Sequence, residues 1–117
     1  MATVIHQNDL IGSVADALQY ISYYHPIDFI QALNKAYEKE ANPAAKDAMA
    51  QILINSRMCA VGHRPICQDT GIVTVFLNVG MDIQWQGDMR VTDMGDEGVR
   101  RAYMNPVTTL RAASLAD

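Results

Sequence analysis

The stretch from His63 to Phe76 reads HRPICQDTGIVTVF, and the hydrophobic pattern of the chain changes within it. Before this stretch, apolar residues recur every three or four positions, which predicts helices. After Gly71 the residues become almost continuously apolar and rich in β-branched side chains, which predicts a buried strand over Ile72–Val79. We therefore predict an α+β fold, with N-terminal helices over residues 1–62 followed by a small sheet and a C-terminal helix.

Three helices are expected before the quoted stretch, each marked by a capping residue or a proline. Asn8-Asp9 can cap the first helix, and His25-Pro26 interrupts its apolar stripe. Pro26 suits the first turn of a second helix that runs to about Ala41. Asn42-Pro43 repeats this arrangement for a third helix, which is expected to end near Gly62.

The segment after the predicted strand has the alternation of a hairpin. Ile83 and Trp85 alternate with polar residues, Gly87-Asp88 can turn the chain, and Met89 and Val91 alternate again. Trp85 is then expected to pack on the sheet.

A short final helix is expected through Tyr103, with Asp93 or Asp96 as its cap and Asn105-Pro106 at its end. The chain then finishes in SLAD, with no glycine or proline in its last residues. We expect that this last apolar pattern continues, and that the chain is a segment of a longer polypeptide.

Composition narrows the function classes. The chain has 117 residues and a net charge of -4, and Arg100-Arg101 is its only adjacent basic pair, which argues against a nucleic-acid surface. No apolar run reaches the roughly 18 residues needed to span a bilayer, and the N-terminus has no secretion-signal pattern. Two cysteines are too few for a disulfide-stapled scaffold, so a reducing cytoplasm is expected.

The five positions from Cys67 to Gly71 offer side chains that suit a metal centre with a polar substrate beside it. Cys67 as a thiolate is a soft metal ligand, Gln68 and Thr70 can donate and accept hydrogen bonds, and Asp69 can handle a proton. Gly71 permits a positive φ and a close approach of the backbone to a ligand. From spacing alone the alternative stays open, because a lone cysteine is often a small core residue and Asp-Thr-Gly is common in turns.

The evidence for other site residues is weaker. Cys59 lies within the third helical pattern and is expected in the core. His63 and Arg64 could contact an anion, although solvated loop residues are the simpler interpretation. His6 and His25 read as a tail residue and a helix-break residue.

The segment Asn55–Phe76, NSRMCAVGHRPICQDTGIVTVF, resembles the iron–sulfur class I fumarases. The segment Val91–Asp117 is also similar to the N-terminal region of that family. The run Arg64–Gly71 is typical of the fumarase and tartrate dehydratase group. The resemblance implies a hydro-lyase that reversibly adds water to fumarate to give (S)-malate in the citric acid cycle.

The resemblance also implies residue roles. The family holds a 4Fe-4S cluster through three cysteines, and Cys67 matches the first of these ligands. Gln68 and Asp69 match residues that contact the dicarboxylate substrate, Asp69 is placed for proton handling, and Arg111 matches an arginine that binds a substrate carboxylate. The other ligand cysteines have no counterpart here, so we expect no cluster on this chain alone.

The chain is accordingly expected to be the N-terminal segment of a larger catalytic domain, completed by the remainder of the catalytic chain or by a β subunit. The family further implies a homodimer. Two alternatives remain open: the α subunit of an L-tartrate dehydratase, and a non-catalytic helical interaction module. The full gene would distinguish them.

Overall fold

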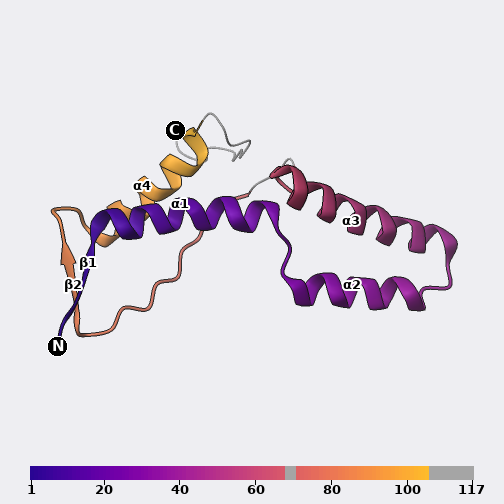
Figure 1. Cartoon of the computed structure of the whole chain (residues 1–117), viewed down its shortest axis with the longest axis horizontal. Helices are drawn as coiled ribbons and strands as arrows, with labels where there is room; N and C mark the ends of the chain where they lie inside the picture. The colour runs from indigo at the N-terminus through magenta and orange to yellow at the C-terminus, as the bar shows by residue number, and fades with distance from the viewer. Residues whose placement is uncertain (68–70, 106–117) are drawn as a thin grey trace. The chain divides into compact units, whose positions relative to one another are not determined.

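The computed structural model describes residues 1–67 and 71–105. Its elements follow in the order β1 (Thr3–His6), α1 (Gln7–Tyr23), α2 (Ile27–Lys39), α3 (Pro43–Gly62), β2 (Ile83–Gln86) and α4 (Val91–Met104), as Figure 1 shows. The predicted α+β class, with helices, a small sheet and a final helix, is confirmed. The described residues fall into two compact units, residues 1–19 with 71–105 and residues 20–67, and α1 contributes to both.

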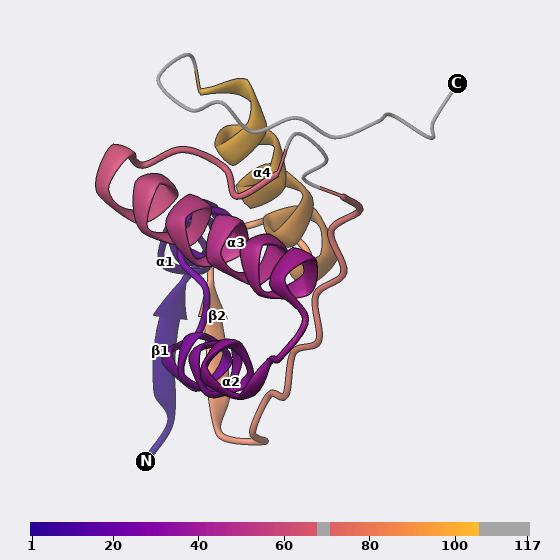
Figure 2. The same ribbon diagram turned by 90° about the vertical axis from the view of Figure 1, so that its right-hand side faces the viewer.

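The sheet is parallel and joins the two chain segments that make up the first unit. β1 and β2 lie side by side in Figure 2, with Thr3 opposite Ile83 and His6 opposite Gln86. The predicted hairpin is therefore wrong in its pairing. Ile83 and Trp85 do lie in a strand, as predicted, but the partner strand is Thr3–His6, where the sequence pattern predicts no strand.

A side chain from α1 explains why the turn after β2 does not lead into a second strand. Gln7 Oε1 accepts hydrogen bonds from the backbone N–H groups of Asp88 at 3.1 Å and Met89 at 3.0 Å. The N–H groups of Asp88 and Met89 are therefore hydrogen-bonded to the first residue of α1 and not to a neighbouring strand. The chain does turn at Gly87, where φ is +135°, but it continues into α4.

The predicted strand over Ile72–Val79 is also wrong. This segment has no regular secondary structure, and Ile72 is 72% exposed and Phe76 93% exposed. Val73, Val75 and Leu77 line a cavity of about 430 Å³ together with residues of α1 and α4. A β-strand needs a neighbouring strand to form hydrogen bonds with, as well as β-branched side chains. In the described part of the chain, no strand pairs with this segment.

The three predicted N-terminal helices are confirmed, with boundaries close to the predicted ones. α1 begins at Gln7, slightly before the predicted Asn8-Asp9 cap. Pro26 precedes α2, and Asn42 caps α3 as predicted, with its Oδ1 accepting from the N–H of Ala44 at 2.9 Å and of Ala45 at 3.3 Å. α3 ends at Gly62, as predicted.

α2 and α3 form an antiparallel helix pair in the second unit (Figure 1). His25 Nδ1 lies 2.9 Å from Ser56 Oγ at one end of this pair, and Lys46 Nζ lies 4.7 Å from the ring centre of Tyr37 at the other. Contacts at both ends therefore fix the alignment of the two helices.

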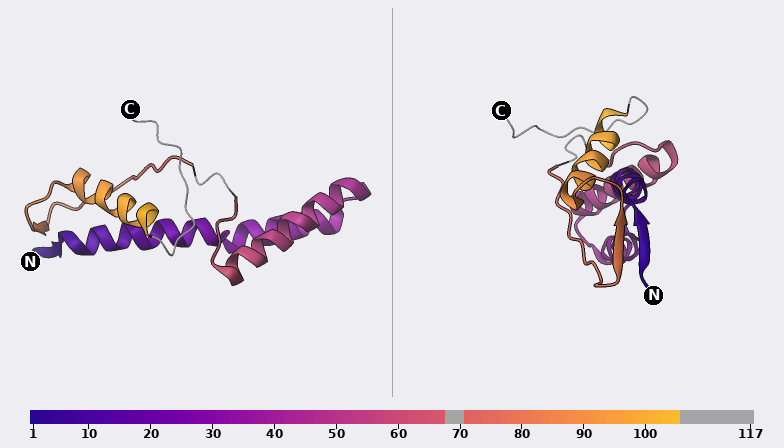
Figure 3. Two further views of the ribbon diagram at one scale, coloured as in Figure 1. Left: turned by 90° about the horizontal axis from the view of Figure 1, so that it is seen from above. Right: turned by 90° about the vertical axis from the view of Figure 1, so that its left-hand side faces the viewer.

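α4 lies along the first part of α1, as Figure 3 shows from above. Gly98 of α4 is buried, and a methyl group there would lie 2.7 Å from Val14 Cβ and 2.9 Å from the Ile11 carbonyl oxygen. This close approach places Ile11 and Met94 in the core of the first unit, each 1% exposed. α4 begins at Val91, so Asp93 lies in its first turn, where it binds Arg90, and neither Asp93 nor Asp96 is its cap.

Candidate active site

The candidate site begins where α3 ends and the chain reverses toward Cys67. His63 follows the helix in the left-handed conformation with φ 50°, and the Arg64 N–H donates to the Cys59 carbonyl at 3.1 Å. These are the features of a helix C-terminal cap, although a histidine stands where glycine is commonest. The cap directs the segment 64–67 back along the helix.

Three further contacts hold this returning segment. The Ile66 N–H donates to the Ser22 carbonyl near the end of α1 at 2.9 Å, and the Asn55 side-chain amide donates to the Ile66 carbonyl at 2.9 Å. The Cys59 thiol lies 3.4 Å from the Pro65 carbonyl, to which it donates. Both polar backbone groups of Ile66 are thus bound, immediately before Cys67.

The two cysteines have different environments. Cys59 is 6% exposed and its thiol is directed at the Asn55 side-chain oxygen and the Pro65 carbonyl, so its prediction as a core residue is confirmed. Cys67 is exposed and reduced at the end of the held segment. Of the two cysteines, Cys67 is therefore the more accessible one.

Several predicted site residues fall outside the described part of the chain. Gln68, Asp69 and Arg111 belong to this group, as does Thr70. Gly71, on the far side of the gap, has φ +74°, so the predicted need for glycine there is confirmed. Within residues 1–67 and 71–105 no three His, Cys, Asp or Glu side chains converge in a metal site. The role of Cys67 as a ligand therefore stays a prediction.

His63 is more constrained than a solvated loop residue. Its Nε2 lies 2.8 Å from the Tyr24 hydroxyl, and its ring stacks on Tyr23 with ring centres 5.8 Å apart. Arg64 is exposed, as predicted for a loop residue. Sequence reasoning missed both Asn55 and the tyrosine pair, because contacts between the end of α1, α3 and a loop leave no local pattern.

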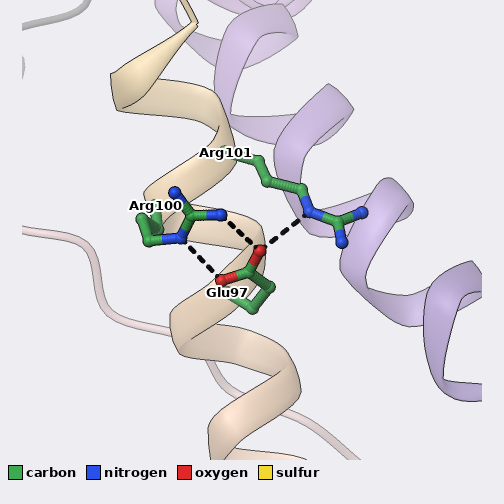
Figure 4. Close-up of polar contacts among 3 residues, drawn as sticks. All are labelled: Glu97, Arg100 and Arg101. Atoms are coloured by element: carbon green, nitrogen blue, oxygen red, sulfur yellow. Dashed lines mark hydrogen bonds and ion pairs between the residues drawn. The ribbon is translucent and has the colours of Figure 1, made fainter.

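A charged cluster on α4 involves the adjacent basic pair. Glu97 accepts two hydrogen bonds from Arg100, both 2.7 Å long, and one from Arg101 at 3.0 Å (Figure 4). The hydrogen bonds from Arg100 and then Arg101 lower the pKa of Glu97 from 4.5 to about 2. The two guanidinium groups are therefore already engaged by a carboxylate of their own helix.

Comparison with known proteins gives two matches. The family described as fumarate hydratase (Fumerase) matches residues 11–117. A protein of Methanocaldococcus jannaschii, provisionally named L(+)-tartrate dehydratase subunit alpha, is 33% identical over 89 residues, which is 76% of this chain and 31% of that relative. The chain thus aligns with about a third of the length of the curated relative. No solved structure gives a significant match, and no described helix has the length and apolar character to cross a membrane.

Proposed function

Because the chain belongs to the fumarate hydratase (Fumerase) family, we propose that it forms part of a hydro-lyase that reversibly hydrates fumarate to (S)-malate. The family match over residues 11–117, which includes the Arg64–Gly71 motif, is the observation that carries this proposal. Since the relative is about three times longer than the aligned region, we assign the activity to a longer catalytic chain, or to an assembly with a β subunit.

We propose Cys67 as a ligand of a 4Fe-4S cluster in that assembly. Its exposed thiol at the end of a held segment fits this role, whereas Cys59 is buried and turned toward Pro65. A cluster takes several cysteine ligands, so the remaining ones come from polypeptide outside this chain. When bound, the cluster supplies a Lewis acid for a substrate hydroxyl or carboxylate.

The substrate-binding roles follow from the motif. Gln68 and Asp69 adjoin Cys67 in sequence and therefore lie near any metal that Cys67 binds. Asp69 exchanges a proton with the reacting substrate, and Gln68 donates a hydrogen bond to it. The planar guanidinium of Arg111 suits a substrate carboxylate, which it binds through two parallel hydrogen bonds.

A second candidate substrate is L-tartrate. The name of the 33% identical relative favours it, and tartrate dehydration is also a hydro-lyase reaction on a dicarboxylate. A separate β subunit would fit this candidate. The third interpretation, a non-catalytic helical interaction module, has no support from the comparisons. The proposal also includes a homodimer, which the resemblance implies, and a cytoplasmic location, which the small number of cysteines indicates.

The test is a turnover assay of the longest natural polypeptide that carries this sequence, with any separate β subunit, reconstituted with iron and sulfide without oxygen. We expect hydration of fumarate to exceed dehydration of L-tartrate, and the reverse would identify a tartrate dehydratase. Absence of both reactions in a fully loaded protein would contradict the proposal.

Two substitutions locate the chemistry. Asp69→Asn should keep the cluster but lower turnover by about 10²-fold or more, because the group that exchanges the proton is removed. Arg111→Met should mainly raise KM, because the carboxylate contact is lost while the metal site stays. If Asp69→Asn turns over normally with a full cluster, Asp69 has no part in the chemistry.

A further inference from the structure

Two α3 side chains one helical turn apart contact the segment that leads to Cys67. Asn55 donates its amide N–H to the Ile66 carbonyl at 2.9 Å. Cys59, four residues later, places its sulfur 3.4 Å from the Pro65 carbonyl and 3.6 Å from the Asn55 side-chain oxygen. Residues at i and i+4 lie on the same face of a helix, so the two side chains act on successive carbonyls of one segment.

The Cys59 thiol also favours one of the two orientations of the Asn55 amide. An asparagine amide can be flipped so that its oxygen and nitrogen exchange places. The single proton of the thiol is shared between the Pro65 carbonyl at 3.4 Å and the Asn55 oxygen at 3.6 Å. This contact favours the orientation in which the Asn55 nitrogen donates to the Ile66 carbonyl. Cys59 therefore has a place in the site although its own sulfur is not presented to a metal.

We propose that Asn55 is a positioning residue for Cys67, oriented by Cys59, and this inference rests on the proposed role of Cys67 as a cluster ligand. The Ile66 N–H is bound to Ser22 of α1 and its carbonyl to Asn55 of α3, so two different helices hold this residue. A rotation about the Ile66 backbone that displaced Cys67 would break one of these bonds. The pair therefore presets the thiol before the metal binds, as outer partners do for other metal ligands.

A purely structural role for Asn55 makes a different prediction. In that case its removal would lower the stability of α3 without a specific effect on metal binding. Asn42→Ala is the matched control, because Asn42 is the same residue type on the same helix and its loss removes an N-terminal cap far along the helix from the Cys67 segment.

The test uses the longest natural polypeptide, with any separate β subunit, and compares wild type, Asn55→Ala, Asn55→Asp, Asn42→Ala and Cys67→Ser. Asn55→Asp keeps an oxygen for the Cys59 thiol but removes the N–H that binds Ile66. Two quantities are measured: hydrogen exchange of the Ile66 amide in the metal-free protein, and the rate at which a chelator removes iron from the loaded protein.

We expect both Asn55 variants to speed Ile66 exchange by about fivefold, the effect of losing one hydrogen bond. Iron loss should accelerate by about 10-fold, and Asn42→Ala should leave the rate of iron loss unchanged. If the Asn55 variants lose iron at the wild-type rate while Cys67→Ser loads no cluster, the positioning role is wrong and the ligand role stands. If Cys67→Ser loads a full cluster, the ligand role and the positioning role are both wrong.

Discussion

Replacement of Gly98 by alanine should destabilise the protein, although helix propensity alone predicts the opposite. Alanine is favoured over glycine within a helix by about 1 kcal/mol. At Gly98, however, the new methyl group would lie 2.7 Å from Val14 Cβ and 2.9 Å from the Ile11 carbonyl oxygen. A backbone oxygen cannot rotate away, so α4 has to shift, and overpacking of this kind costs about 1 to 3 kcal/mol. We expect a net loss of about 1 kcal/mol.

Gly95→Ala and Gly12→Ala are the matched controls. Gly95 lies one turn earlier in α4 and Gly12 lies in α1, and at both positions a methyl group would have no described atom within 4 Å. Both variants should therefore gain the helix-propensity term of up to about 1 kcal/mol. Gly98→Ala and Gly95→Ala are thus expected to differ by about 2 kcal/mol.

Urea unfolding followed by circular dichroism measures this difference, and a melting curve should show it as a separation of about 8 °C for a domain of this size. Equal stabilisation by alanine at Gly95 and Gly98 would refute the reasoning. It would mean that α4 does not approach α1 at Ile11 and Val14.

Three further predictions concern stability and charge. Asn42→Ala should lower the free energy of unfolding by about 1 kcal/mol in urea titrations, because α3 loses its N-terminal cap; an unchanged midpoint would contradict this. Ile11→Ala should cost about 2 to 5 kcal/mol, because a side chain that is 1% exposed leaves a cavity, and a loss below about 1 kcal/mol would argue against this core. The pKa of Glu97 is lowered in the folded protein from 4.5 to about 2, so its contribution to stability is present above pH 4.5 and is lost as the pH falls toward 2. At low salt, wild type should therefore lose stability more steeply than Glu97→Gln across this window, and an NMR titration midpoint near 4.5 for Glu97 would contradict the ion-pair geometry.

The helices could be predicted from sequence because their signals are local. Asn42-Pro43 and His25-Pro26 act within a few residues of themselves, and the structure places helix boundaries at both. The sheet could not be predicted in the same way. β1 and β2 are separated by three helices, and Thr3–His6 has only four residues, so its pairing depends on contacts far along the chain.

The predicted strand over Ile72–Val79 is wrong because a side-chain pattern does not show whether a partner strand is present. Continuous β-branched residues describe a surface that can pack in a sheet, but they do not provide the partner strand. Similarly, the motif Cys67–Gly71 predicts a set of site residues from sequence alone, whereas the Asn55 contact with Ile66 is visible only in the structure. A contact between two residues that lie 11 positions apart, on either side of a helix end, leaves no recognisable pattern in the sequence.

The most direct test of the central claim is the iron and sulfide content of the full-length polypeptide carrying Cys67→Ser, measured beside Cys59→Ser after reconstitution without oxygen. Cys59→Ser keeps a donor toward Pro65 and should load a cluster. Cys67→Ser should load none, because a hydroxyl is a poor ligand for a soft metal centre. A full complement of iron and sulfide in Cys67→Ser would contradict the account.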